Sequence, residues 1–169
     1  MDFETSNLIA SFVIGDGSLP KNAKNARYSC KQILAHEDYI RWQAEILSRV
    51  TPVKIYFGEA KVDSNGVNHQ KTISVETRSH PFFQTLRDRN YFQGRKTVSL
   101  HDVKNFNWQS LAIWYMDDGY ILRSDNKYHS GNVFLCTDNF SHAEVLTLQK
   151  LLYAKFDLQF DTRKRNDTY

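Results

Sequence analysis

The chain has 169 residues, of which 41% are hydrophobic and 14% aromatic, which is enough apolar material for one compact domain or two small halves. Its formal net charge is +3, from 22 basic and 19 acidic side chains, so the total permits a nucleic-acid partner without requiring one. The sequence has only two cysteines, no basic N-terminal segment and no apolar run long enough to span a membrane. We therefore do not expect a disulfide-rich, a secreted or a membrane protein.

The first predicted element is an apolar helix that ends in an acid and a glycine, at residues 8–17. Thr5 or Ser6 is its expected N-terminal cap. Because this helix and the one predicted over 107–119 are each apolar almost all round, we expect both to be buried. A strand and turn over 18–25 and a strand over 27–34 follow. Four cations and no acid lie between Gly17 and His36 in this stretch: Lys21, Lys24, Arg27 and Lys31.

An amphipathic helix over 36–50 precedes a predicted hairpin. Its first strand spans 53–62, with Ile55 and Phe57 expected on the inner face, and Asn65-Gly66 is the turn. The return strand spans 68–78 and directs Ile73 and Val75 inward. Its polar face holds Gln70, Thr72, Ser74, Glu76 and Arg78. Such a face is usually only solvated, but these side chains also suit the reading of base edges in a major groove.

A helix over 81–90 and a basic loop over 91–97 complete the first half. The second half begins with another apolar helix, over 107–119, that ends in Asp117, Asp118 and Gly119. An acid at a helix C-terminus opposes the helix dipole, so we interpret Asp118 as retained for its chemistry. Gly119 is expected to end the helix in the left-handed conformation.

The elements that follow repeat the first half. We predict strands over 120–126 and 132–137, a turn at Asp125-Asn126, and a helix that starts at the capping box Ser141–Glu144. A strand over 158–165 would direct Gln159, Arg163 and Arg165 outward. Asp16 and Asp118 are 102 residues apart, and the next helix begins 20 residues after the first acid and 23 after the second. This agreement favours a duplicated unit.

The segments at 9–17 and 111–119 both resemble the nine-residue signature of LAGLIDADG homing endonucleases, in the branch with two motifs in one chain. The resemblance implies an α+β fold of two pseudo-symmetric αββαββα units. It also implies saddle-shaped antiparallel sheets that straddle DNA, with the motif helices at the interface. We expect the first half over 1–100 and the second over 101–169. The second, αββαβ, lacks equivalents of residues 64–96, so the sequence is a fragment, another chain supplies that piece, or this copy is degenerate.

The resemblance further implies a site-specific double-strand DNA endonuclease that hydrolyses phosphodiester bonds and is encoded by a mobile intron or intein. Paired carboxylates on adjacent helix ends can hold Mg²⁺, with Mn²⁺ as a substitute. By resemblance, Asp16 and Asp118 are the catalytic metal ligands, the carbonyls of Gly15 and Asp117 contribute, and Lys96 lies near the scissile phosphate. We interpret the Asp117 side chain as structural rather than as a third ligand. For Lys96, a role as an ordinary loop lysine is an alternative of equal weight to the catalytic one.

The expected partner is double-stranded DNA with a long target site, bound by a monomer unless another chain supplies the missing piece. The candidate contacts are Lys21, Lys24, Arg27, Lys31, Gln70, Thr72, Ser74, Arg78, Gln159, Arg163 and Arg165. The alternative is a catalytically inactive binder such as an intron maturase that acts on RNA. In the plainest alternative the helices are merely buried and the basic loops merely solvated. We expect a soluble intracellular protein with no membrane partner, in an organelle (mitochondrion or chloroplast) or a bacterial or phage-host cytoplasm.

Overall fold

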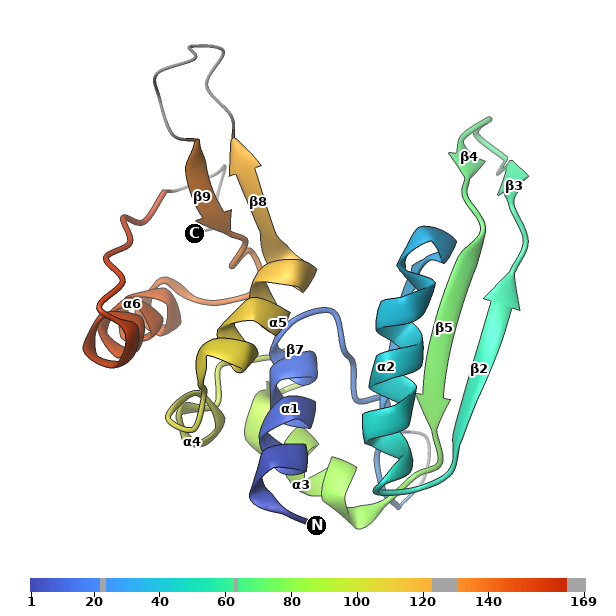
Figure 1. Ribbon diagram of the computed structural model, residues 1–169, viewed down its shortest axis with the longest axis horizontal. Coiled ribbons are helices and arrows are strands. Elements are labelled where there is room, and N and C mark those ends of the chain that lie inside the picture. The colour runs from blue at the N-terminus through green and yellow to red at the C-terminus, as the bar shows by residue number, and fades with distance from the viewer. Residues whose placement is uncertain (22–23, 63, 123–130, 164–169) are drawn as a thin grey trace. The chain divides into compact units, whose positions relative to one another are not determined.

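The computed structural model describes residues 1–21, 24–62, 64–122 and 131–163 (Figure 1). The chain is α+β with antiparallel sheets, as predicted. Packing divides it into two compact units, Met1–Asp88 (unit 1) and Arg89–Tyr169 (unit 2). The predicted halves, 1–100 and 101–169, concern the repeat rather than the packing and stay a prediction. Across the described ranges, no helix is both long enough and apolar enough to cross a membrane.

Unit 1 begins with α1 (Phe3–Ile14), which is buried along most of its length. Its N-terminal cap is Asp2, whose Oδ1 accepts a hydrogen bond from the Thr5 amide at 2.7 Å. The predicted cap at Thr5 or Ser6 is therefore wrong, because the helix begins earlier than its apolar run. Asp2, Thr5 and Ser6 are all residue types that favour the N-cap position, and Asp2 is the one that precedes the first turn of the helix.

The sheet of unit 1 has the order β1-β5-β2, all antiparallel, from β1 (Ser29–Ile33), β5 (Thr72–Thr77) and β2 (Val53–Gly58). The helix α2 (Glu37–Ser48), entered through the 3₁₀ turn η1 (Leu34–His36), packs against all three strands. Cys30, Ile73 and Val75 are buried on the inner face, which confirms the predicted alternation of the return strand. The predicted strand over 18–25 is reduced to one bridge from Ser18 to Ser29 among its described residues.

The predicted hairpin is present, but its strands are interrupted. The short strands β3 (Lys61–Val62) and β4 (Asn68–His69) pair beyond β2 and β5, and Gly66 has φ +80° in the turn. Phe57, predicted to point into the core, is 58% exposed because β2 is an edge strand of the sheet. The helix α3 (Pro81–Asn90) follows as predicted and buries Phe83 and Leu86.

An aromatic cluster joins α1 to α2 and the sheet. The Phe12 ring lies 5.3 Å from that of Trp42 and 6.4 Å from that of Tyr28, measured between ring centroids. Tyr28 is fully buried, and its hydroxyl donates to Gln43 Oε1 at 2.9 Å. Edge-to-face aromatic packing and this buried hydrogen bond fix α1 to the body of unit 1.

Unit 2 opens with a two-stranded hairpin, β6 (Tyr91–Phe92) and β7 (Arg95–Lys96), where a loop was predicted. Gln93 and Gly94 have φ +50° and +82°, as a two-residue hairpin turn requires. The prediction was wrong because a glutamine in the left-handed region is not a usual turn signal. The short helix α4 (Leu100–Val103), capped by Ser99, was not predicted.

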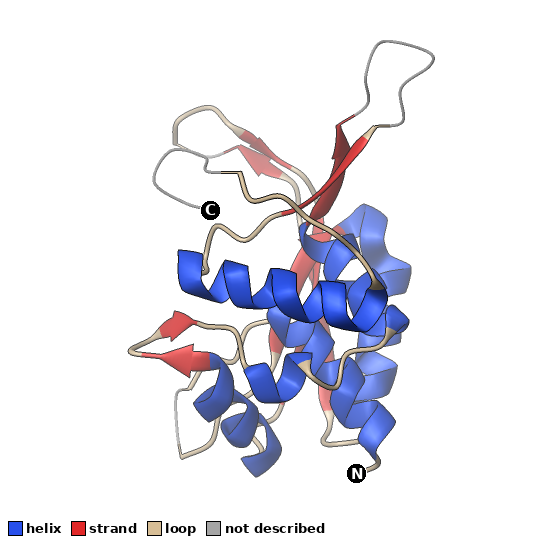
Figure 2. Ribbon diagram, turned by 90° about the vertical axis from the view of Figure 1, so that its left-hand side faces the viewer, coloured by secondary structure: helices blue, strands red, loops and turns tan. Residues whose placement is uncertain are grey.

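The helix α5 (Trp108–Asp118) carries the second motif and starts at a capping box between Asn107 and Ser110. It buries Leu111, Ile113 and Trp114 but leaves Trp108 and Met116 more than half exposed, so its predicted burial all round is wrong. β8 (Gly119–Leu122) and β9 (Asn132–Leu135) pair antiparallel, as Figure 2 shows. The turn predicted at 125–126 lies outside the described residues.

The capping box at Ser141–Glu144 is confirmed and starts α6 (His142–Phe156). The strand predicted over 158–165 is not formed in its described part, residues 158–163. There the Phe160 carbonyl accepts a hydrogen bond from Gln149 Nε2 at 2.6 Å, so the segment is bound to α6 rather than to a neighbouring strand.

Candidate active site

Asp16 lies on an exposed turn just beyond α1, which ends at Ile14. The Gly17 amide turns the chain back by donating to the Phe12 carbonyl at 2.8 Å. A Cβ on Gly17 would collide with that carbonyl oxygen and would lie 2.6 Å from Tyr28 Cε2. Only glycine fits between the helix end and the buried tyrosine, so the backbone beside Asp16 is fixed by the core of unit 1.

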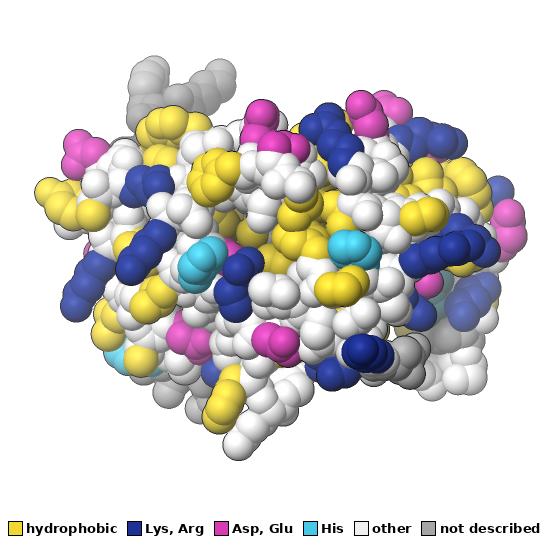
Figure 3. All heavy atoms as spheres, turned by 90° about the horizontal axis from the view of Figure 1, so that it is seen from below, with side chains coloured by type: hydrophobic (Ala, Val, Ile, Leu, Met, Phe, Trp, Pro, Cys, Tyr) yellow, Lys and Arg dark blue, Asp and Glu magenta, His cyan; other side chains and the backbone are white. Residues whose placement is uncertain are grey.

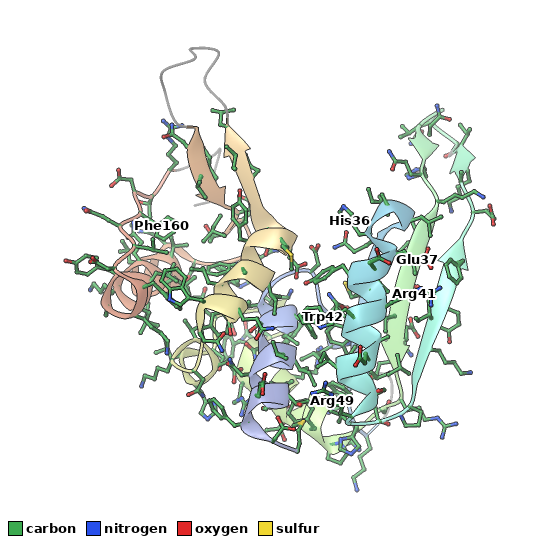
Figure 4. The ribbon with its side chains drawn as sticks, in the orientation of Figure 1. His36, Glu37, Arg41, Trp42, Arg49 and Phe160 are labelled. Atoms are coloured by element: carbon green, nitrogen blue, oxygen red, sulfur yellow. The ribbon has the colours of Figure 1, made fainter. Side chains whose placement is uncertain are left out.

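Two side chains that sequence reasoning missed form a chain of contacts that begins at this acid. Gln32, on β1, donates from Nε2 to Asp16 Oδ2 at 2.5 Å. The Oε1 of the same amide lies 3.2 Å from Nδ1 of His36, which stands at the start of α2 (Figure 4). The amide can thus orient the carboxylate while the imidazole holds the amide. The contact between Gln32 and Asp16 depends on how β1 runs back past the end of α1, and this course cannot be inferred from the spacing of the residues in the sequence.

Asp118 is the last residue of α5 and is half-buried, as is Asp117 before it. The Asp118 carbonyl accepts from the Cys136 amide at 2.8 Å, which fixes this end of the helix to the residue after β9. Gly119 has φ −96°, so the predicted left-handed stop is wrong. The glycine is required for another reason, since a Cβ would collide with the ring and carbonyl oxygen of Tyr115.

The candidate metal ligands are all oxygen donors: two carboxylates and the carbonyls of Gly15 and Asp117. Hard oxygen donors of this kind suit Mg²⁺. Asp16 belongs to unit 1, and Asp118 belongs to unit 2. Among the described residues, no group of three or more His, Cys, Asp and Glu side chains gathers as a metal site. The pairing of the two aspartates at one metal stays a prediction.

Lys96 is half-buried and lies on β7, opposite Tyr91. Both flanks of this lysine are tied to α6. The Arg95 guanidinium lies 3.1 Å from Glu144 Oε2, and the Val98 amide donates to Glu144 Oε1 at 2.9 Å. Desolvation raises the pKa of Glu144, but hydrogen bonds from Ser141 and Val98 and the Arg95 charge together leave that pKa below its ordinary value.

The outward face of the sheet in unit 1 gathers three of the predicted DNA contacts. Lys31 and Ser74 are cross-strand partners, and Thr72 lies beside them on β5. Tyr56 and Lys54 continue the same face on β2, and both are exposed. They were missed because the alternation of β2 was judged from its apolar positions alone. Arg27 extends the face beyond β1 and lies 3.6 Å from Glu76.

The remaining predicted DNA contacts are scattered over both units. Those of unit 1 outside the sheet are all exposed: Lys21, Lys24, Gln70 and Arg78. In unit 2, Gln159 and Arg163 are exposed, and the Arg163 guanidinium lies 5.7 Å from the centroid of the Phe134 ring. Arg165 lies outside the described residues. On the face shown in Figure 3, basic side chains are mixed with acidic and hydrophobic ones, so that face carries no field of a single sign.

Comparison with known proteins gives the chain relatives along almost its whole length. It is 25% identical to Protein RecA of Mycolicibacterium flavescens over 93% of the chain and 37% of that protein. It is 25% identical to the cytochrome b mRNA maturase bI2 of Debaryomyces hansenii over 97% of the chain and 61% of that protein. It is also 25% identical to DNA endonuclease I-ChuI of Chlamydomonas applanata, over 96% of the chain and 77% of that protein. The chain thus spans well under two thirds of the first of these relatives.

Its fold matches that of the homing endonuclease I-WcaI bound to its DNA recognition sequence, with a TM-score of 0.81 at 21% identity. The match covers 97% of this chain and 72% of that one. The sequence profile of the LAGLIDADG DNA endonuclease family matches residues 8–169. With both motif helices, the α+β fold and this match in agreement, the chain belongs to the LAGLIDADG DNA endonuclease family.

Proposed function

We propose that the chain is a site-specific DNA endonuclease that hydrolyses a phosphodiester bond in each strand, with Mg²⁺ held by Asp16 and Asp118. The observation that carries the proposal is the matching construction of the two helix ends. At each one an acid is followed by a glycine that has no room for a Cβ. Helix termination alone does not require this, because neither Gly17 nor Gly119 has a positive φ.

The residues of this chain have distinct tasks in that reaction. A divalent cation would supply a deprotonated water and neutralise charge on the phosphate. Gln32 donates to one oxygen of Asp16 and so would fix the orientation of that carboxylate as it binds a cation. Lys96 provides a positive charge beside the pentavalent phosphate, where fixed charges lower the barrier most.

The sheet of unit 1 supplies a surface for duplex DNA. Lys31, Lys54 and Arg27 are cations for phosphates, whereas Thr72 and Ser74 on the sheet can donate to or accept from base edges, as can Gln70 just before β5. Because phosphate contacts release counterions, affinity should fall steeply as salt rises. A surface with both kinds of side chain fits a long target read with graded specificity.

The test uses Asp16→Asn and Asp118→Asn, with Asp38→Asn on an exposed turn of α2 as the matched control. Cleavage is measured with Mg²⁺ on a plasmid library of randomised duplex inserts, and Mn²⁺ binding is measured by calorimetry. We expect both site variants to lose cleavage by at least about 1000-fold and to lose cation binding, while DNA affinity stays within about twofold. Cleavage by either variant at the unchanged rate would refute the metal assignment.

The second candidate is an intron maturase, an RNA-binding splicing cofactor without nuclease activity. It is favoured by the 25% identity to the cytochrome b mRNA maturase bI2 over 97% of the chain. Competition between a structured intron RNA and duplex DNA for the wild-type chain separates the two. Preference for RNA, together with absence of metal-dependent cleavage, would replace the nuclease proposal by this one.

A further inference from the structure

The carboxylate of Glu144, in the first turn of α6, does more than cap its own helix. Its Oε2 accepts from the Ser141 amide at 2.7 Å and from the Ser141 hydroxyl at 2.6 Å. These contacts complete the capping box. The same carboxylate also accepts from the Val98 amide at 2.9 Å and from Arg95 at 3.1 Å. A capping box needs only the first set.

The second set of contacts brackets Lys96. Arg95 precedes it and Val98 follows two residues later, so one carboxylate holds the chain on both sides of the lysine. Thr97 is fixed as well, since its amide donates to the Asn90 carbonyl at 2.8 Å. The hairpin that carries Lys96 has only two residues in each strand. A hairpin this short is marginal by itself, so its position depends on such outside contacts.

A buried polar cluster fixes the base of the same hairpin. Asp102, 6% exposed, accepts from Asn90 Nδ2 at 2.7 Å and lies 2.8 Å from the Arg89 guanidinium. Asn90 is the last residue before β6. These contacts hold the start of the hairpin. Glu144 contacts its other end, at β7 and just after it.

We infer that Glu144 is a positioning residue for Lys96, a role that rests on the proposed function of that lysine. In this role Glu144 acts through the backbone of the hairpin rather than on the phosphate. It sets the course of β7 and residues 97–98, and thereby the point from which the lysine side chain extends. Displacement of a catalytic group by about 1 Å can cost on the order of 100-fold in rate, so loss of this contact should act on turnover more than on binding.

The test is a double-mutant cycle in the full chain with Glu144→Gln and Lys96→Ala. The amide keeps the volume of the side chain but removes its charge and one of its two acceptor oxygens. The Ser141 cap and the Val98 amide would then compete for the one oxygen that remains. The matched control is Ser141→Ala, which removes the hydroxyl half of the cap and leaves the contacts of Glu144 with Arg95 and Val98 in place. For each variant, the turnover and the Michaelis constant for DNA cleavage are measured separately.

We expect Lys96→Ala to slow turnover strongly and Glu144→Gln to slow it at least about tenfold, with the Michaelis constant within about twofold. In the Lys96→Ala background, Glu144→Gln should add less than about twofold. Ser141→Ala should turn over almost normally. Equal effects of Glu144→Gln in both backgrounds, or a Ser141→Ala defect as large as that of Glu144→Gln, would overturn the inference while leaving the role of Lys96 intact. Normal turnover by Lys96→Ala would overturn both.

Amide hydrogen exchange gives a readout that does not depend on cleavage. Glu144→Gln should accelerate exchange of the Val98 amide by about tenfold or more, whereas Ser141→Ala should leave this amide protected. Unchanged protection of Val98 in Glu144→Gln would show that the carboxylate does not hold this segment, and the inference would fail.

Discussion

Gly17→Ala separates two opposing effects at the residue after the first acid. Gly17 does not have a positive φ, so by backbone conformation alone alanine should stabilise the protein by about 0.4–1 kcal/mol through the unfolded state. The new Cβ, however, would collide with the Phe12 carbonyl oxygen and lie 2.6 and 2.8 Å from the ring and hydroxyl of Tyr28. Neither neighbour can move cheaply, because Tyr28 is fully buried and hydrogen-bonded to Gln43.

Overpacking of this kind costs about 1–3 kcal/mol, so the collision outweighs the gain and we expect a net loss of about 1–2 kcal/mol. The assay is urea unfolding, followed by Mn²⁺ binding, which should weaken because the turn that carries Asp16 must shift. Gly66→Ala is the control: it has φ +80° and open space around it, so it should cost about 1 kcal/mol from strain while leaving Mn²⁺ binding unchanged. A Gly17→Ala protein as stable as the wild type would refute the packing argument.

Three further outcomes follow from the polar contacts. Tyr28→Phe should lower the unfolding free energy by about 1–2 kcal/mol in urea titrations, because Gln43 loses its buried partner. Asp102→Asn should cost about 1–3 kcal/mol by the same method, because the Arg89 guanidinium loses its counter-charge while remaining only 29% exposed. Because the folded-state pKa of Glu144 lies below 4.5, its stabilising contribution is complete above about pH 4.5 and is lost as the pH falls through the lowered value. The stability difference between wild type and Glu144→Gln should therefore be smaller at pH 3 than at pH 7, and an equal difference would contradict this assignment.

The fold was predictable where a local pattern has a single physical meaning. Alternating burial at Ile73 and Val75, the Asn65-Gly66 turn and the capping box at Ser141 all depend on neighbouring residues in the chain, and each is confirmed. Where the outcome depends on a distant partner, the prediction was wrong. The strand expected over 158–165 is not formed in its described part, residues 158–163, because a side chain of α6 binds that segment instead.

The candidate site divides in the same way. Asp16 and Asp118 stand out in sequence because each ends an apolar helix before a glycine. Gln32 and His36 do not. The contact of Gln32 with Asp16 depends on the course of β1 after the turn, and that of His36 with Gln32 depends on the 3₁₀ entry to α2. The contacts of Glu144 could likewise be predicted only in part. Its capping box is a local pattern, whereas its contact with the Lys96 hairpin joins residues more than 40 positions apart and has no local signal.

Residues 12–43 of unit 1 build the turn that carries Asp16. The Phe12 carbonyl accepts from the Gly17 amide, the Tyr28 ring lies against Gly17, and Gln32 donates to the Asp16 carboxylate. Each of these contacts lies within residues 1–88. A chimaera that joins residues 1–88 to a foreign second unit would therefore keep Asp16 together with the contacts that shape its turn, and redesign would concern the junction.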